Sequence, residues 1–539
     1  PAPTPPDNPL LATRGAFRCL ISMRTPRLLS LLLAVFAGGS TLFAAGFRLG
    51  SPFSDHMVLQ REKPVAVWGW ADAGESVTVT FAGQSKSATA GADGKWTLKL
   101  DALPASAEPR SLVAAGKDGH KAEAKDVLVG EVWLGSGQSN MAMTVQSSKN
   151  FAAEKAAAKH PLIRHYRESS GPASEPQPEG KGSWQECTPE NVGGFSAALY
   201  FFGRDLQREL GVPVGLVNTS VGGTPIESWL SAETQSSDPD TKAVYDARLK
   251  EHVSFDEAGA GELFRKQTER WKNAVAKAKQ EGKAFVTPAP KNPLAMRKLK
   301  GGPAHLYNGK VANLAPFTLR GMLWYQGEGN AQSPEAAQLY VKQLSQLVTS
   351  WRALWQDEVP FAWVQLPNYR DSEAEGWPRM RESMTKVLAL PKTGMAITID
   401  VGDPKNIHPT DKQTVGARLA FWALGTVYGR KVPAISGPLP AGHKVEGSSI
   451  RVSLRHAEGL KTRDGDAVRG FLIAGADKAW KKASARIDGG DVVVSSPEVA
   501  APVAVRYAWL ENPDCNLVNG AGLPASTFRT DDWPVPATK

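Results

Sequence analysis

The chain has 539 residues, of which 42% are hydrophobic and 22% charged, and its formal net charge is +9. This length exceeds what one hydrophobic core supports and predicts about two to four domains, while the composition is ordinary for a globular protein. The positive charge is too diffuse to indicate a nucleic-acid partner. Its densest basic stretch, residues 266–300, is interleaved with Glu and Gln and is typical of a solvated helical face.

Residues 1–45 have the order of a secretory targeting segment. Arg24 and Arg27 precede an apolar run over residues 28–37, and small residues follow. Residues 1–22 are predicted to be an upstream extension, because the methionine that follows them is a suitable start. Removal of the segment would leave a secreted or periplasmic protein with no stable membrane insertion. An uncleaved anchor is the alternative, although the apolar run is short for a span of about 20 residues.

Residues 46–126 are predicted to form an N-terminal all-β module. Turn clusters such as residues 92–94 separate runs in which apolar and polar residues alternate, found at residues 65–70, 76–81 and 95–100. The pattern is typical of a small sandwich. Carbohydrate binding is one interpretation, but we favour a packing module that braces the next domain.

Strands and helices alternate over residues 127–430, which predicts a parallel sheet with helices on both faces. The expected strands are 214–218, 319–325, 360–366 and 396–400. The expected helices are 196–210, 334–355, 377–390 and 412–429. A polar, mostly helical stretch at about 232–300 interrupts the alternation, and we interpret it as an insertion that walls one side of a site.

Residues 431–539 return to strands and predict a C-terminal β module. The expected strands include residues 450–454, 492–495 and 503–509. No internal repeat or low-complexity tract accompanies these modules.

Cys187 and Cys515 are the cysteines that follow the targeting segment. They lie far apart in sequence and imply no disulfide framework, so two unrelated free thiols are expected, with pairing in an exported protein as the alternative. No group of Cys or His has the spacing of a metal site, so we predict neither a metal nor another cofactor.

The most informative stretch is the pentapeptide Gly-Gln-Ser-Asn-Met at residues 137–141. It follows an apolar run over residues 127–134 that predicts a buried strand, so Ser139 is expected at the carboxyl edge of the sheet, where open α/β sheets bind ligands. Gln138 and Asn140 flank the serine with amides suited to orienting a polar substrate. The spacing is not the Gly-x-Ser-x-Gly nucleophile elbow, because a methionine replaces the second glycine. An ordinary strand-to-helix turn capped by Asn140 is the alternative.

A second apolar run, residues 394–399, ends in a polar turn that carries His408. A serine nucleophile needs a general base within hydrogen-bond reach, and the base needs a partner that fixes its tautomer. The turn supplies one imidazole and two carboxylates, Asp400 and Asp403. Because loops at the ends of parallel strands meet at one edge of the sheet, we predict that His408 reaches Ser139.

Taken together, these segments resemble the sialate O-acetylesterase family, within the SGNH class of serine esterases. The resemblance covers nearly all of the chain after the targeting segment. It rests on SDHMVLQR at 54–61, GQSNM at 137–141, GGTPIESW at 222–229, WYQGE at 324–328, IHP at 407–409 and GLPASTFRTD at 522–531. Each segment is a weak signal alone, but their order and separations are specific. The resemblance implies an SGNH-hydrolase-like α/β fold and a carbohydrate O-acetylesterase activity.

The resemblance implies that Ser139 is the nucleophile and His408 the general base. Typical SGNH enzymes place an aspartate three residues before the histidine, but Lys405 occupies that position here. Asp403 lies in the same loop and is the predicted third member of the triad. Asp400 is the alternative, as is a dyad assisted by a backbone carbonyl.

Donors to a developing oxyanion are expected from three segments. The backbone N–H of Ser139 is one, and the turn at Gly222 and Gly223 should supply another, since glycine lets the backbone approach the substrate. SGNH enzymes add a side-chain amide, which here is predicted to be Gln326 or Asn330. Glu328 is expected to bind substrate hydroxyls or to hold its loop against its neighbours.

The expected substrate is an O-acetylated carbohydrate, with sialic acids implied by the resemblance. Arg370 and Arg381 are candidates for binding a sialic acid carboxylate. The aromatic rings near the strand ends would stack on a sugar or belong to the core; these are Trp229, Trp324 and Tyr325. The alternatives are an acetylxylan or other polysaccharide acetylesterase and, from another class, a carbohydrate-binding protein without catalysis.

Overall fold

The computed structural model describes residues 46–534. The predicted targeting segment, residues 1–45, lies outside the described residues. Within 46–534, no helix combines the length and apolar character needed to cross a bilayer.

The largest sheet is built around β8 (Lys121–Gly137), whose second half is buried on both faces. Its strand order is β10-β9-β11-β8-β12-β13-β14. The pairs from β9 to β14 are parallel, and only the edge strand β10 runs antiparallel to its neighbour. The bounds of β8's partners are β9 His160–Glu168, β10 Gly182–Cys187, β11 Val214–Asn218, β12 Gly321–Tyr325, β13 Phe361–Val364 and β14 Thr393–Ala396.

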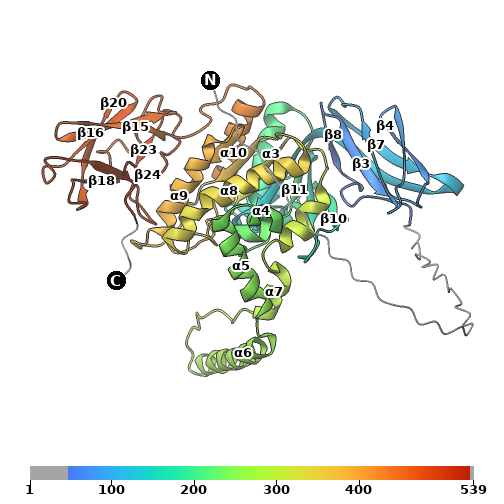
Figure 1. Ribbon diagram of the computed structural model, residues 1–539, viewed down its shortest axis with the longest axis horizontal. Helices are drawn as coiled ribbons and strands as arrows, with labels where there is room; N and C mark the ends of the chain where they lie inside the picture. The colour runs from blue at the N-terminus through green and yellow to red at the C-terminus, as the bar shows by residue number, and fades with distance from the viewer. Residues whose placement is uncertain (1–45, 535–539) are drawn as a thin grey trace, which may run out of the picture. The chain divides into compact units, whose positions relative to one another are not determined.

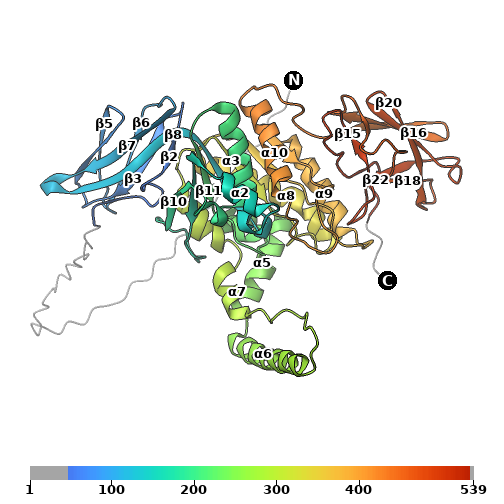
Figure 2. The ribbon, with the colours of Figure 1, turned by 180° about the vertical axis from the view of Figure 1, so that it is seen from behind.

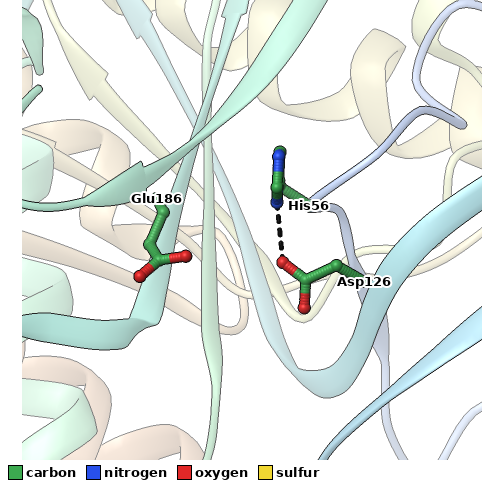
Figure 3. Close-up of side chains that lie close together, drawn as sticks. All are labelled: His56, Asp126 and Glu186. Atoms are coloured by element: carbon green, nitrogen blue, oxygen red, sulfur yellow. Dashed lines mark hydrogen bonds and ion pairs between the residues drawn. The ribbon is translucent and has the colours of Figure 1, made fainter.

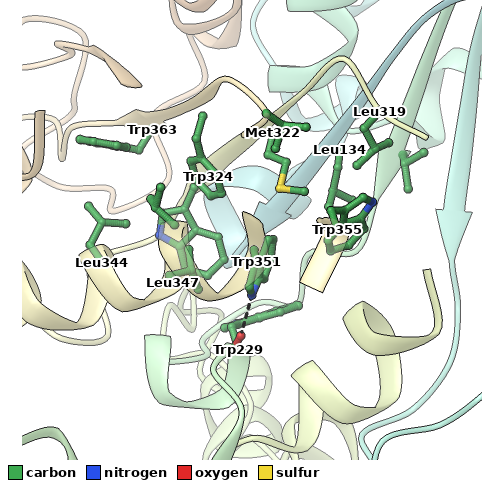
Figure 4. Close-up of a cluster of buried hydrophobic side chains, with 14 of the residues drawn as sticks. Leu134, Trp229, Leu319, Met322, Trp324, Leu344, Leu347, Trp351, Trp355 and Trp363 are labelled. Carbon is green, nitrogen blue, oxygen red and sulfur yellow. Dashed lines mark hydrogen bonds between the residues drawn. The ribbon is translucent and has the colours of Figure 1, made fainter. Parts of the chain in front are cut away.

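Helices cover both faces of this sheet (Figure 1). On one face, alternate strand residues such as Leu323 and Tyr325 share a core with α3 (Ala197–Leu210) and α10 (Lys412–Trp422). On the other face, Met322 and Trp324 pack toward α8 and α9. These two helices span Pro334–Trp355 and Gly376–Lys386. The second core is rich in tryptophan, and in it Trp351 donates a hydrogen bond of 3.1 Å to the carbonyl of Trp229 (Figure 4).

Helix starts follow the capping chemistry of the sequence. The hydroxyl of Ser196 accepts a hydrogen bond from the amide of Leu199 and begins α3, and Ser333 caps α8 ahead of a proline at its first position. The Asp411 carboxylate accepts from the amide of Thr414 and begins α10. The predicted helix 412–429 continues beyond α10 as a π-helical turn, Ala423–Val427. The predicted strand 396–400 is wrong in its bounds, since β14 ends at Ala396 and the chain then turns toward His408.

The N-terminal strands join the large sheet through β8 (Figure 2). The first half of β8 pairs with β7 (Ser106–Ala115), and its second half pairs with β11 and β12. The predicted boundary at residue 126 therefore falls inside one strand. The remaining strands are β1 Arg48–Leu49, β2 Val58–Gln60, β3 Val65–Trp70, β4 Ser76–Phe81, β5 Gln84–Thr89 and β6 Lys95–Leu100.

The C-terminal strands form two four-stranded antiparallel sheets and a two-stranded ladder. The first sheet is β15 (Leu439–Glu446), β16 (Ser449–Arg455), β21 (Asp491–Ser495) and β20 (Ser484–Asp488). The second is β19 (Lys481–Lys482), β18 (Phe471–Ala474), β22 (Ala504–Tyr507) and β24 (Phe528–Arg529), and the ladder joins β17 (Lys461–Thr462) to β23 (Leu517–Val518).

The predicted insertion is helical, as expected. It contains α4 (Ala232–Ser236), α5 (Pro239–Val253), α6 (Glu257–Gln280) and α7 (Pro293–Lys300). No residue of α6 is buried, whereas α7 ends at Lys300, whose ammonium reaches Gly223.

Candidate active site

The nucleophile turn is created by a close approach between two strands. Gly137, the last residue of β8, has φ 129°, and a methyl group there would lie 2.2 Å from the carbonyl oxygen of Tyr325. Only glycine fits this position. The chain then enters the single-turn helix α1 (Ser139–Ala142) with Ser139 as its first residue, partly exposed at the carboxyl edge of the sheet.

The structure brings Ser139 and His408 together. His408 Nε2 lies 2.7 Å from Ser139 Oγ, although the two residues are 269 positions apart in the chain. The turn that carries His408 is held by its own amide, which donates to Asn406 Oδ1 at 3.0 Å. Burial, followed by the charges of Lys412 and Lys291, lowers the pKa of His408 below its ordinary 6.5. The imidazole is therefore neutral at neutral pH and able to accept the serine proton.

Neither predicted aspartate reaches His408. Asp403 Oδ1 accepts a hydrogen bond of 2.8 Å from the amide of Lys405, so its side chain closes its own turn. Asp400 forms ion pairs of 2.6 Å with Arg418 and 3.1 Å with Arg463. Among residues 46–534, no carboxylate makes a hydrogen bond to this imidazole. The predicted Asp403–His408 hydrogen bond is thus not formed, because local turn chemistry holds the carboxylate.

Backbone donors lie next to the serine. The amide of Val221 donates to the carbonyl of Gly137 at 3.1 Å, which fixes the following glycine turn beside the end of β8. A methyl group on Gly222 would lie 3.5 Å from Ser139 Cβ. In the described part of the chain, the N–H groups of Ser139 and Gly222 donate to no protein acceptor. Two unpaired donors beside a nucleophile can stabilise an oxyanion.

The side-chain amides predicted as further donors are engaged with one another. Gln326 Nε2 donates to Asn330 Oδ1 at 2.9 Å and to Gln138 Oε1 at 3.2 Å, and its Oε1 accepts from Tyr340 at 2.7 Å. Asn330 Nδ2 donates to both oxygens of Glu227 at 3.1 Å. Gln138, Gln326 and Asn330 therefore brace the loops around the site, and neither Gln326 nor Asn330 presents a free donor to a substrate.

A buried polar bridge is centred on Asn140, the residue after the serine. Asn140 Nδ2 donates to Glu328 Oε1 at 2.5 Å, and Asn140 Oδ1 accepts from Lys412 Nζ at 2.6 Å. Burial raises the pKa of Glu328 and lowers that of Lys412 to about 7. Sequence reasoning missed Lys412, because a lysine directly after a capping aspartate is typical of an exposed helix start.

Two cavities flank the glycine turn. The larger, about 620 Å³, is lined by Gly222 and by Arg167 and Lys298. The smaller, about 420 Å³, is lined by Gly223 and by Lys300. The segment that ends α7 contributes to both cavities, so the insertion walls the site on this side.

The predicted stacking aromatics belong to the core. Trp229, Trp324 and Tyr325 are each 0% exposed.

The two arginines proposed to bind a substrate carboxylate make contacts with other protein groups. Arg381 is buried and donates to the carbonyls of Leu366, Pro367, Leu510 and Glu511, and Arg370 pairs with Glu511 at 3.1 Å.

A second cluster of potential ligand groups lies on the N-terminal side. His56, Asp126 and Glu186 approach one another (Figure 3), and His56 Nδ1 lies 2.6 Å from Asp126 Oδ2. Arg164 Nη1 is 2.5 Å from the same carboxylate, and its Nη2 is 3.6 Å from Glu186. The guanidinium already compensates both acids, so this cluster does not indicate a cation site.

Comparison with known proteins agrees with the predicted resemblance. Residues 129–287 and 293–424 match the family described as carbohydrate esterase, sialic acid-specific acetylesterase. The sialate O-acetylesterase of Rattus norvegicus is 30% identical over 94% of this chain and 98% of its own length, and that of Homo sapiens is 29% identical over 94% and 97%. The crystal structure of a carbohydrate acetylesterase from Xanthomonas citri is 35% identical, with a TM-score of 0.75 over 90% of this chain and 99% of that one. The chain belongs to the carbohydrate esterase family of sialic acid-specific acetylesterases.

Proposed function

We propose that this protein hydrolyses O-acetyl esters on sugars through a covalent acetyl-enzyme formed on Ser139. The hydrogen bond of 2.7 Å between His408 Nε2 and Ser139 Oγ carries the proposal. Ser139 Oγ attacks the acetyl carbonyl carbon while its proton moves to His408 Nε2. The carbonyl oxygen becomes an oxyanion that the N–H groups of Ser139 and Gly222 can stabilise.

Collapse of this intermediate breaks the bond to the sugar oxygen. His408 then returns its proton to that oxygen, and the sugar leaves with a free hydroxyl. A water molecule, deprotonated by the same imidazole, attacks the acetyl-enzyme. The bond between the acetyl carbon and Ser139 Oγ then breaks, His408 returns the proton to Oγ, and acetic acid leaves and ionises to acetate. The cycle needs one base and no resident metal or organic cofactor.

The role of a third residue is part of the proposal. Asp403 remains our candidate for a carboxylate that assists His408, although it would need to leave the amide of Lys405 to do so. If it assists, Asp403→Asn loses much more activity than Asp400→Asn. Equal activity of Asp403→Asn and the wild type would support a Ser139–His408 dyad.

For the substrate we propose O-acetylated sialic acids, which carry a carboxylate. The support comes from the cations that line the two cavities. Arg167, Lys298 and Lys300 make no ion pair with any residue of 46–534, whereas Lys310 in the same wall is paired with Glu168 at 2.5 Å. These cavities adjoin the glycine turn that packs against Ser139, and unpaired cations there suit an anionic sugar. An acetylated neutral polysaccharide such as acetylxylan is the second candidate, because the chemistry at Ser139 does not depend on the sugar.

The test is acetate release by protein lacking residues 1–45. O-Acetylated sialic acids and acetylated xylan are compared, with Ser139→Ala as the control, which should lose about 10⁴-fold or more in kcat. Release from sialic acids alone supports the full proposal, and release from xylan alone replaces the substrate. No release from either would leave the sugar unassigned and make a carbohydrate-binding protein the next alternative to test.

A charge variant separates the two substrates further. Lys298→Ala should raise KM for the sialic acid ester and leave hydrolysis of a neutral acetyl ester unchanged.

Export of the protein through residues 1–45 belongs to the same proposal. It would be tested by finding the processed protein outside the cytoplasm.

A further inference from the structure

We infer that Lys412 and Glu328 are positioning residues for the reaction, acting through Asn140 to hold the loop of His408 against Ser139. The inference rests on the proposed function and goes beyond it, because the side chains of both residues bond to Asn140 and to neither the serine nor the histidine. It starts from two neighbouring pairs in the chain. Ser139 meets His408, and the next residue, Asn140, meets the one before the histidine, Ile407.

The contact between Asn140 and Ile407 fixes the geometry of the contact between Ser139 and His408. Asn140 Nδ2 donates to the carbonyl oxygen of Ile407 at 3.0 Å, so α1 and the histidine loop are joined at two adjacent positions. A loop held at one point can pivot, whereas two contacts set both the distance and the direction of the imidazole. A displacement of about 1 Å at such a site can reduce the rate by about a hundredfold.

The amide of Asn140 has a defined orientation because it lies between opposite charges. An asparagine side chain can rotate by 180° and exchange its oxygen for its nitrogen. Here Lys412, which as an ammonium can only donate, lies on one side at 2.6 Å, and Glu328 Oε1 lies on the other at 2.5 Å. The rotated amide would direct its NH₂ toward an ammonium and its oxygen toward a carboxylate. Only the observed orientation leaves a donor for Ile407.

The burial of these groups argues that the bridge has a purpose beyond stability. Lys412 and Asn140 are 0% exposed and Glu328 is 2% exposed, and Glu328 Oε2 has no hydrogen-bond partner within the described residues. Burying two charges that are separated by an amide is costly compared with apolar side chains of similar size. The ammonium also lies 5.0 Å from the ring of Tyr325, which offers some compensation.

The charge of Lys412 should affect the pKa of His408, which a role in packing alone would not do. The groups that face Lys412 are Glu328 and Tyr325 from the β12 side and Asp411 from its own helix cap. His408 faces Ser139, Lys412 and Lys291. Lys412 is buried, whereas Lys291 is exposed to solvent. The positive charge of Lys412 at the imidazole is therefore screened less than that of Lys291. Removing this charge should make His408 easier to protonate.

The experiment uses an alkyl fluorophosphonate, which labels an activated serine without needing the correct sugar. Labelling of Ser139 is followed by mass spectrometry across pH in the wild type, in Lys412→Met and in Lys291→Ala. In Lys412→Met we expect the rate to fall by about tenfold or more and the acid midpoint to rise by about 0.5 to 1 pH unit. Lys291→Ala is the matched control, since its exposed charge is screened and should shift the midpoint less.

The outcomes separate the inference from the function on which it rests. No labelling of Ser139 in the wild type would overturn the proposed function. Normal labelling in the wild type together with a wild-type rate and midpoint in folded Lys412→Met would overturn the inference alone.

If circular dichroism shows that Lys412→Met does not fold, two variants of Glu328 test the inference instead. Glu328→Gln keeps an oxygen that can accept from Asn140, whereas Glu328→Leu does not. A labelling rate within about threefold of the wild type in the first and at least about tenfold lower in the second supports the positioning role. Equal rates in the two variants would contradict it.

Discussion

Replacement of Glu131 should reveal how strongly the N-terminal strands are tied to the catalytic sheet. This carboxylate lies in β8 and is 0% exposed. It accepts from Arg61 at 2.5 Å, from Arg320 at 2.6 and 3.1 Å, and from the hydroxyl of Tyr428 at 3.0 Å. Removing one partner of a buried ion pair costs about 3–5 kcal/mol, because the remaining charge stays buried. Since the side chains of Arg61 and Arg320 are 19% and 17% exposed and can recover some water, we expect Glu131→Leu to cost about 3 kcal/mol.

The same two arginines provide the control. Glu62 contacts Arg61 at 3.4 Å and Arg320 at 3.3 Å, but its side chain is 58% exposed. A surface pair of this kind contributes about 1 kcal/mol or less, so Glu62→Gln should change the free energy of unfolding little. Urea unfolding followed by tryptophan fluorescence compares both variants with the wild type. A loss below about 1 kcal/mol for Glu131→Leu would refute the claim that burial of this carboxylate decides its contribution.

Other predictions follow from the titrating groups. Ester hydrolysis should fall to half of its maximum at a pH below 6.5, because the base works when neutral and burial lowers the pKa of His408; a midpoint above 6.5 would contradict this. Burial raises the pKa of Cys187 to about 12 and of Cys515 to about 11, so iodoacetamide at pH 8 should alkylate the folded protein about a hundredfold more slowly than the unfolded chain. Burial also lowers the pKa of His165 to about 3, so the unfolded state binds a proton that the folded state does not, and stability is lost as the pH falls from 6.5 toward 3. Between pH 7 and 5 the wild type should lose about 2 kcal/mol more than His165→Gln, as measured by urea unfolding at both pH values.

Hydrophobic pattern and capping residues were sufficient to predict several elements of the central α/β region. The strand at Val214–Asn218 and the helix at Pro334–Trp355 have the predicted bounds. The strand is a short apolar run that follows Pro213 and ends before polar residues, and the helix is a long amphipathic segment that begins at the Ser333 cap. The strand before the histidine loop was less predictable. The apolar residues up to Ile399 remain buried although β14 ends at Ala396. The hydrophobic pattern therefore extends beyond the last residue that pairs with a neighbouring strand.

The meeting of Ser139 and His408 could be predicted because both follow strands of one parallel sheet. Their hydrogen bond confirms the expected proximity. The partner of the histidine could not be predicted in the same way. Whether Asp403 faces the imidazole or the amide of Lys405 depends on the local geometry of one turn, and residue spacing does not encode it. The free thiols of Cys187 and Cys515 agree with their separation in sequence.

The surroundings of His408 favour one half of the proposed reaction over the other. A carboxylate partner would stabilise the imidazolium and raise its pKa, which makes a stronger base. While Asp403 stays on the amide of Lys405, no carboxylate offsets burial and Lys412, which act in the opposite direction. In that arrangement the neutral imidazole is the weaker base and its conjugate imidazolium the stronger acid. Expulsion of a sugar alkoxide is the step that most needs a strong acid, because a sugar hydroxyl is a poor leaving group. A low pKa of His408 therefore helps the return of a proton to the sugar and disfavours the removal of the proton from Ser139. The short hydrogen bond between His408 and Ser139 Oγ compensates for the weaker base in the step of proton removal.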